Sequence, residues 1–126
     1  MRVVDTSAWI EWLIGSPVGE QVVGALPSND QWIVPTIVQF ELARWRTRVG
    51  SAKASAEVIA FTNELIVRSL DTPLAVMAAQ CGAQYGLAMA DAIIYATALD
   101  AGADLLTCDA HFKDLPGIIY LAKGAV

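Results

Sequence analysis

Four acidic residues stand at positions where a carboxylate is costly to bury. Asp5 and Asp109 each follow a short apolar run typical of a buried strand. Glu41 and Asp91 lie inside stretches of helical periodicity with mostly apolar neighbours. An isolated buried carboxylate is strongly disfavoured unless it is paired or binds a metal. Because few cationic residues lie near these acids in the sequence, the pattern predicts an acidic pocket that holds a hard divalent ion.

The types of ligand available indicate which ion the pocket would take. Carboxylate oxygens favour Mg²⁺ or Mn²⁺, whereas zinc prefers cysteine or histidine. The chain has one histidine, His111, and two cysteines, Cys81 and Cys108, at no metal-binding spacing. A Mg²⁺ ion held by a few carboxylates and several waters is typical of phosphoryl-transfer sites. The acids therefore indicate metal-assisted attack on a phosphate.

Each acid also has an ordinary structural explanation. Asp5 and Asp91 could cap the helices near whose starts they lie. Glu41 could pair with Arg44, one helical turn away. Asp109 could be a turn residue. One shared metal site explains all four acids together, and it requires that the fold bring them to one place.

The elements that must position these acids alternate between strands and helices. Strands are predicted at residues 2–5, 32–34, 104–107 and 118–121. Helices are predicted at about 8–14, 17–26, 37–48, 52–69, 72–85 and 89–101. Thr36 and Gln39 form a capping-box pattern before the third helix. This alternation predicts an α/β fold with a short, mostly parallel central sheet flanked by helices, and the carboxyl ends of its strands would share one edge.

Composition limits the class of protein. The chain of 126 residues fits one domain, expected to span 1–126, and its hydrophobic fraction of 56% suggests apolar surface covered by a second copy. A net charge of −5 and a pI of about 4.6 argue against a general phosphate-coating binder. The longest apolar stretch is too short to span a bilayer. We expect a cytoplasmic protein with no membrane partner and with free thiols at Cys81 and Cys108.

Four segments resemble those of PIN domains. They are Val-Val-Asp-Thr-Ser-Ala-Trp-Ile at the start, Phe-Glu-Leu-Ala around Glu41, Met-Ala-Asp-Ala-Ile-Ile-Tyr-Ala-Thr-Ala-Leu around Asp91, and Leu-Leu-Thr-Cys-Asp-Ala-His-Phe around Asp109. In this order the chain is similar, over essentially its whole length, to the VapC-type toxin ribonucleases of toxin–antitoxin pairs. The resemblance implies a PIN-like single domain and an endoribonuclease, a hydrolase dependent on Mg²⁺ or Mn²⁺.

The resemblance also implies roles for individual residues. The catalytic acids would be Asp5, Glu41, Asp91 and Asp109. We assign metal binding to Asp5, Asp91 and Asp109, and we expect Glu41 to orient or deprotonate the attacking water.

Supporting hydroxyls and partners follow from the same resemblance. Thr6, Ser7 and Thr107 fall on positions that support the acids or the metal-bound waters. The implied partners are an RNA substrate, a cognate antitoxin protein that covers the site, and a second copy in a homodimer.

Two further groups of residues have alternative interpretations. Half of the basic residues fall in one stretch and could grip an RNA backbone or could offset a helix dipole; they are Arg44, Arg46, Arg48 and Lys53. The tryptophans fit core or interface anchors better than base-stacking platforms; they are Trp9, Trp12, Trp32 and Trp45. His111 could contact a phosphate or act as an acid, or it could be a loop residue without a role.

Two other functions remain open from the sequence. A phosphatase with an aspartate nucleophile also begins with a strand that ends in Asp, but such enzymes usually carry a second Asp two positions later, where this chain has Ser7. The other alternative is a non-catalytic dimeric binding module whose acidic pocket is structural.

Overall fold

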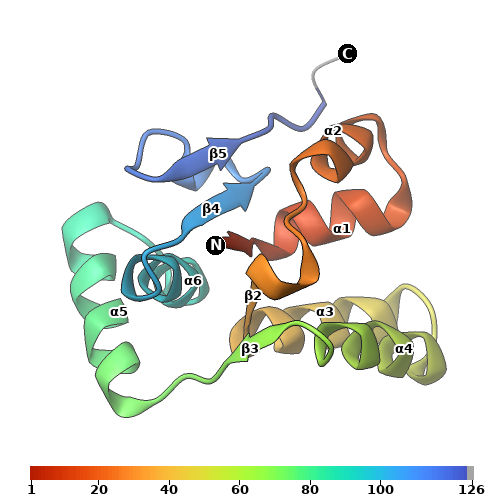
Figure 1. The fold of residues 1–126 in the computed structure, drawn as a ribbon, viewed down its shortest axis with the longest axis horizontal. Helices are drawn as coiled ribbons and strands as arrows, with labels where there is room; N and C mark the ends of the chain where they lie inside the picture. Colours follow the sequence, from red (N-terminus) through yellow and green to blue (C-terminus); the bar gives the residue numbers. More distant parts are fainter. Residues whose placement is uncertain (125–126) are drawn as a thin grey trace.

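The protein, described by a computed structural model for residues 1–124, alternates between strands and helices along the chain (Figure 1). Within that range it has five strands, six α-helices and two short 3-10 helices. In chain order they are β1 (Arg2–Val4), α1 (Thr6–Ile14), α2 (Pro17–Ala25), η1 (Asn29–Gln31), β2 (Trp32–Pro35), α3 (Thr36–Arg48), α4 (Ala52–Thr62), β3 (Ile66–Arg68), α5 (Thr72–Tyr85), α6 (Met89–Asp100), β4 (Asp104–Thr107), η2 (Ala110–Phe112) and β5 (Ile118–Tyr120). No helix in that range is both long enough and apolar enough to cross a membrane.

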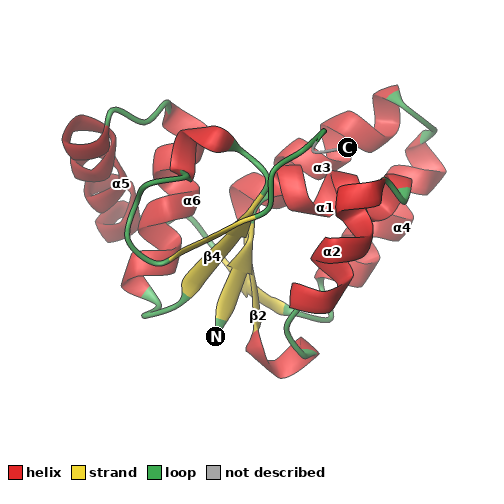
Figure 2. Ribbon diagram, turned by 90° about the horizontal axis from the view of Figure 1, so that it is seen from above, coloured by secondary structure: helices red, strands yellow, loops and turns green. Residues whose placement is uncertain are grey.

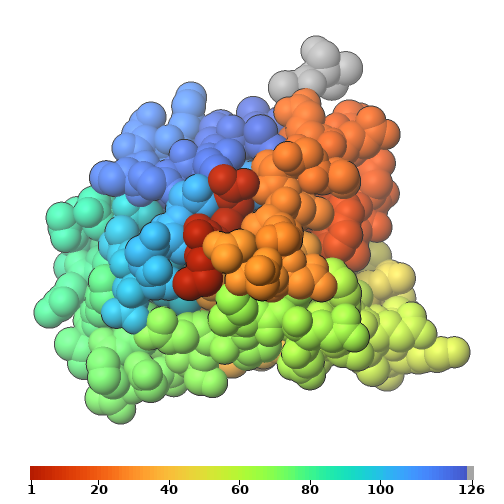
Figure 3. Space-filling model, in the orientation of Figure 1, coloured from red at the N-terminus to blue at the C-terminus, as the bar shows by residue number. Residues whose placement is uncertain are grey.

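The strands form one parallel sheet with β1 at its centre. The order is β3-β2-β1-β4-β5, and every neighbouring pair is parallel. Val3 is in register with Ile33 on one side and with Leu105 on the other. The space-filling view accordingly shows the first residues, in red, flanked by orange and blue segments (Figure 3). The predicted α/β class with a parallel sheet is confirmed.

Helices cover both faces of this sheet. Helices α5 and α6 lie on one side of the strands, and α1 to α4 lie on the other (Figure 2). The central strands β1 and β4 are buried on both faces, with Val3, Val4, Leu105 and Leu106 fully buried. Burial on both faces explains why these strands read as unbroken apolar runs rather than as alternating patterns.

An aromatic cluster fills the space between α1, β2 and α4. The rings of Trp9, Trp12, Trp32 and Phe61 lie 4.8–6.0 Å apart, centre to centre. Trp9 and Trp32 are buried, and Trp12 packs against the core. Trp45 is only partly buried at the rim of the core. The prediction that the tryptophans serve as packing anchors is confirmed.

The predicted long helix at 52–69 is wrong. Helix α4 ends at Thr62, whose hydroxyl donates to the carbonyl of Ile59. The chain then enters β3, in which Ile66 pairs in parallel with Ile33 of β2. Phe61, Leu65 and Ile66 are spaced like one helical face, but a three-residue edge strand is too short to display a period of its own.

The predicted capping box before α3 is also wrong. The N-cap position is Pro35, the last residue of β2, and Thr36 is already helical. The hydroxyl of Thr36 accepts instead from the backbone N–H of Leu70, and the Gln39 amide donates to Thr62 and to Asn63. These side chains connect α3 to the following elements because β2 continues into α3 without an intervening loop.

Candidate active site

Asp5 and Asp109 lie next to each other at the carboxyl edge of the sheet. Asp5 directly follows β1, and Asp109 lies two residues beyond the end of the adjacent strand β4. The backbone N–H of Asp5 continues the β1–β4 ladder by donating to the carbonyl of Leu106 at 2.8 Å. From β1 the chain builds the sheet in one direction through β2 and β3, whereas β4 and β5 lie on the other side. Ligands in open α/β sheets bind at such a switch point.

Two hydroxyl groups hold the Asp5 carboxylate. Its Oδ2 accepts from the Ser7 hydroxyl at 2.6 Å and from the Thr107 hydroxyl at 2.7 Å. Backbone N–H groups in turn donate to these hydroxyls, from Cys108 to Ser7 at 3.0 Å and from Asp109 to Thr107 at 2.9 Å. The hydroxyls therefore join the ends of β1 and β4 around one carboxylate.

The capping explanation for Asp5 is wrong. Asp5 occupies the N-cap position of α1, but its side chain makes no capping hydrogen bond. Its backbone carbonyl alone accepts from the first turn of the helix, from Ala8 and Trp9.

Burial and neighbouring charge shift the pKa of Asp5. The side chain is almost completely enclosed, with 3% of the residue exposed. Burial is the main cause that raises its pKa from 3.8 to about 6, and the hydroxyls of Ser7 and Thr107 oppose that rise. The charges of Asp91 and Asp109 raise it further. The three carboxylates are therefore close enough to repel one another.

Glu41 reaches the same region from α3. The Thr6 hydroxyl, in the first turn of α1, donates to Oε1 of Glu41 at 2.8 Å. Arg44 does not pair with Glu41, and its guanidinium lies 5.1 Å from the centre of the Phe40 ring. Within residues 1–124 Glu41 has no ion-pair partner. The proposed Glu41–Arg44 pair is therefore wrong.

Asp91 faces the other acids from the first turn of α6. The N-cap of this helix is Ala88, without a side-chain cap, so Asp91 does not cap it. Helix α6 contacts β1, β4 and α3. Burial is the main cause that raises the pKa of Asp91, and the charges of Asp109 and Glu41 also raise it. The neighbouring His111 lowers it. Each of the four predicted acids is therefore coupled to at least one other.

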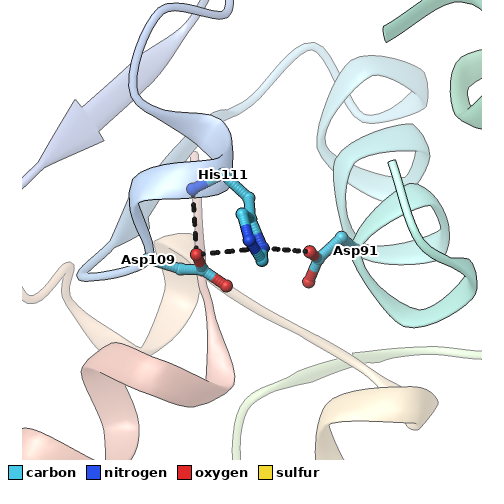
Figure 4. Close-up of side chains that lie close together, drawn as sticks. All are labelled: Asp91, Asp109 and His111. Carbon is cyan, nitrogen blue, oxygen red and sulfur yellow. Dashed lines mark hydrogen bonds and ion pairs between the residues drawn. The ribbon is translucent and has the colours of Figure 1, made fainter. Parts of the chain in front are cut away.

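His111 lies between two of these acids (Figure 4). Its Nδ1 is 3.4 Å from Oδ2 of Asp91 and 3.3 Å from Oδ1 of Asp109. Its backbone N–H donates to the same Oδ1 of Asp109 at 2.9 Å. One ligand atom from each of these residues lies within 4.8 Å of the other two, an arrangement that could hold a single metal ion.

This compact group differs from the predicted metal ligands in one member. Asp91 and Asp109 belong to both sets, whereas His111 belongs only to the compact group and Asp5 only to the predicted ligands. The only sequence indication for His111 was its position two residues after Asp109. Asp104 and Asp100 lie outside the group, because Arg2 binds Asp104 at the opposite edge of the sheet and Arg68 binds Asp100.

The predicted basic stretch does not form a single surface. Arg44 and Arg48 line a shallow hollow beside Phe40 on α3. Arg46 lines a different groove beside Trp45, and its guanidinium donates to the carbonyl of Val49 at 2.9 Å. Lys53 is exposed on α4 and lines neither of these hollows. Only Arg44 and Arg48 share the face that also carries Phe40, the neighbour of Glu41.

The PIN domain family model matches residues 2–118 of the chain. The search of curated proteins found no match to this chain by sequence. Among solved structures, a toxin–antitoxin complex from Klebsiella pneumoniae aligns with 21% identity and a TM-score of 0.79, covering 94% of this chain and 96% of that chain. A VapC toxin of Mycobacterium tuberculosis, described as cleaving the sarcin–ricin loop, aligns with 16% identity and a TM-score of 0.76, covering 93% and 96%. DNA-bound VapBC from Salmonella typhimurium aligns with 18% identity and a TM-score of 0.72, covering 94% and 95%. At these identities the likeness establishes a shared fold.

Proposed function

This chain belongs to the PIN domain family, and we propose that it is a divalent-metal-dependent endoribonuclease, the toxin of a type II toxin–antitoxin pair. The observation that carries the proposal is the convergence of carboxylates from four separate segments on the carboxyl edge of the sheet. Asp5 and Asp91 both have raised pKa values, to which neighbouring carboxylates contribute. A group of carboxylates this close together needs a cation to be fully ionised at neutral pH.

The donor set fits a hard divalent ion. Asp91 and Asp109 would hold it, and we assign the buried Asp5 as a third carboxylate ligand, since oxygen ligands favour Mg²⁺ or Mn²⁺. When bound, the ion would lower the pKa of a coordinated water and offset the charge that develops on the phosphate under attack.

The residues around the metal-binding acids would orient the attacking water, accept its proton and hold the Asp5 carboxylate in position. Glu41 is fixed by the Thr6 hydroxyl, and we assign to it the role of orienting the attacking water and accepting its proton. Ser7 and Thr107 fix the Asp5 carboxylate in one orientation. Such pre-organisation keeps the acids in place without rearrangement during the reaction.

Partners are proposed from the surface and from the related structures. Phe40 and Met89, which lie close in sequence to the site acids, are 55% and 77% exposed. Large apolar side chains exposed beside an acidic site suit a surface that another chain covers. We assign this cover to a second copy in a homodimer and to an antitoxin protein, since the Klebsiella and Salmonella structures are toxin–antitoxin complexes.

An aspartate-nucleophile phosphatase fits the geometry less well. The nucleophile of such an enzyme must reach the phosphorus atom, whereas Asp5 is 3% exposed and its Oδ2 already accepts two hydrogen bonds. Direct attack by water therefore suits this site better than a phospho-aspartyl intermediate.

Cleavage of total RNA tests the proposal. The untagged protein is incubated with RNA in Mg²⁺, in Mn²⁺ or in a chelator, and the new ends are mapped. We expect cleavage only with a divalent ion, and we expect Asp91→Asn to abolish it. Metal-free stability of Asp91→Asn should be equal or higher, because the change removes a carboxylate whose pKa burial and Asp109 raise.

Asp114→Asn is the matched control, because Asp114 is exposed and lies outside the acidic group. It removes the same charge and should leave cleavage unchanged. Undiminished cleavage in the chelator would contradict the proposal, and so would wild-type activity of Asp91→Asn.

A further inference from the structure

The only histidine of the chain lies against the acidic pair, and the proposed hydrolysis gives it no role. We propose that His111 is a direct nitrogen ligand of the ion held by Asp91 and Asp109, and that it makes the site prefer imidazole-binding transition ions such as Ni²⁺ to Mg²⁺. This inference rests on the proposed metal site and deepens it, because it concerns which ion the site selects. Oxygen ligands alone would leave Mg²⁺ as an equal candidate.

The spacing of the three ligand atoms fits one coordination sphere. In an octahedral Mg²⁺ site, bond lengths of about 2.0–2.1 Å put adjacent ligand atoms about 3 Å apart and opposite ones about 4.2 Å apart. Nδ1 of His111 lies 3.3 Å from Asp109 Oδ1 and 3.4 Å from Asp91 Oδ2. These two separations exceed an adjacent pair by only a few tenths of an ångström, and one ligand atom of each of the three residues lies within 4.8 Å of the others. Modest side-chain movements would therefore bring the three atoms onto one ion.

The local fold holds His111 in place without burying its ring. The residue lies in the 3-10 helix η2, where its backbone N–H donates to Asp109 at 2.9 Å. The next residue, Phe112, is fully buried against Tyr95, whose hydroxyl donates to the carbonyl of Pro116 at 2.7 Å. The imidazole side chain is 74% exposed, whereas that of Asp91 is 18% exposed. The backbone is therefore anchored, and the ring lies on the solvent side of the carboxylates.

The chemistry of imidazole supplies the selectivity. Mg²⁺ favours oxygen ligands and gives up its waters reluctantly. Imidazole suits zinc, copper, iron and nickel, whereas Mg²⁺ and Mn²⁺ suit oxygen ligands, and affinities at mixed nitrogen and oxygen sites generally rise from Mn²⁺ to Ni²⁺ and Cu²⁺ in the Irving–Williams order. Replacing one water ligand by the nitrogen of His111 therefore strengthens binding of a transition ion more than binding of Mg²⁺.

A single histidine makes the test direct. In untagged protein labelled with ¹⁵N-histidine, the two imidazole nitrogens of His111 are the only side-chain nitrogens observed. Zn²⁺ serves as a diamagnetic probe. We expect the addition of saturating Zn²⁺ to shift the Nδ1 resonance of His111 much more than its Nε2 resonance. An unmoved Nδ1 under saturating Zn²⁺ would overturn the proposal.

Metal affinities give a second, independent measurement. Calorimetry with Ni²⁺ and with Mg²⁺ compares the wild type with His111→Gln, and Lys113→Gln is the control at another exposed position of the same segment. We expect His111→Gln to weaken Ni²⁺ binding at least about tenfold, since losing even an outer partner of a metal ligand typically costs about 10–100-fold in affinity. The loss for Mg²⁺ should be much smaller, and Lys113→Gln should change neither. His111→Asp should restore binding with Mg²⁺ now favoured.

The outcomes separate this proposal from the proposed function. Equal losses for both ions in His111→Gln would mean that the ring acts without binding the metal, which overturns the inference. If Asp91→Asn then still abolished metal binding and RNA cleavage, the nuclease proposal would stand. If the wild type bound neither ion, both proposals would fall together.

Discussion

Asp5→Asn should make the metal-free protein more stable at neutral pH. Asp5 is buried, and its pKa is raised from 3.8 to about 6, mainly by burial. A carboxyl group with a raised folded pKa holds its proton more tightly in the folded state than in the unfolded state. Stability is therefore lost as pH rises from about 4 to about 6, and the loss is complete above about pH 6. Since one pKa unit corresponds to about 1.4 kcal/mol, the full loss is about 3 kcal/mol.

Asparagine resembles the protonated carboxyl group in charge and shape, and its amide oxygen can still accept from Ser7 and Thr107. We expect Asp5→Asn to be more stable than the wild type by about 1–3 kcal/mol at pH 7.5 in a chelator, and by almost nothing near pH 4. Urea denaturation measures this difference, and it corresponds to a midpoint about 1 M higher for the variant.

Two further measurements separate the effect of burying Asp5 from the effects of net charge and of metal binding. Asp114→Asn removes one exposed carboxylate, so it reports the effect of net charge alone. In millimolar Mn²⁺ the order should reverse, because the wild type gains binding free energy that Asp5→Asn loses. The reasoning is refuted if Asp5→Asn is less stable than the wild type at pH 7.5 in the chelator, or if the difference does not change with pH.

Two further predictions concern the surface and the core. Arg44→Ala should weaken RNA binding without changing Mn²⁺ affinity and should lower the salt slope by about 0.7, the value for one phosphate contact on a single strand. Arg46→Ala is its control because the Arg46 guanidinium is engaged with Val49, and equal slopes for the two variants in filter binding would contradict the prediction. Phe112→Ala should destabilise the protein by about 3–5 kcal/mol in urea denaturation, because Phe112 is fully buried. A loss below about 1 kcal/mol would show that η2 is not anchored by this ring.

The sequence predicted the sheet edge of the site well. Asp5 and Asp109 follow runs that are buried on both faces, and such runs are readable as parallel strands. Once two strands are parallel, their carboxyl ends must share an edge, so the proximity of these two acids followed from local pattern alone.

Other parts depended on tertiary placement. Strand β3 forms because Ile66 pairs with Ile33 along the edge of β2 that faces away from β1, and no local period reveals this pairing. His111 meets Asp91 only because α6 packs against β1 and β4, and this packing brings together residues 20 positions apart in the sequence. Side-chain contacts between separate elements of this kind have no signature in spacing.

The central position of β1 has a consequence for the order in which the protein is made. Asp5 is bound by Thr107, 102 positions later in the chain. A growing polypeptide therefore carries Asp5 from the start but cannot enclose it until β4 has emerged from the ribosome. Until then Asp5 has neither its hydroxyl partner Thr107 nor its neighbour Asp109. A half-synthesised chain would thus lack the completed acidic site.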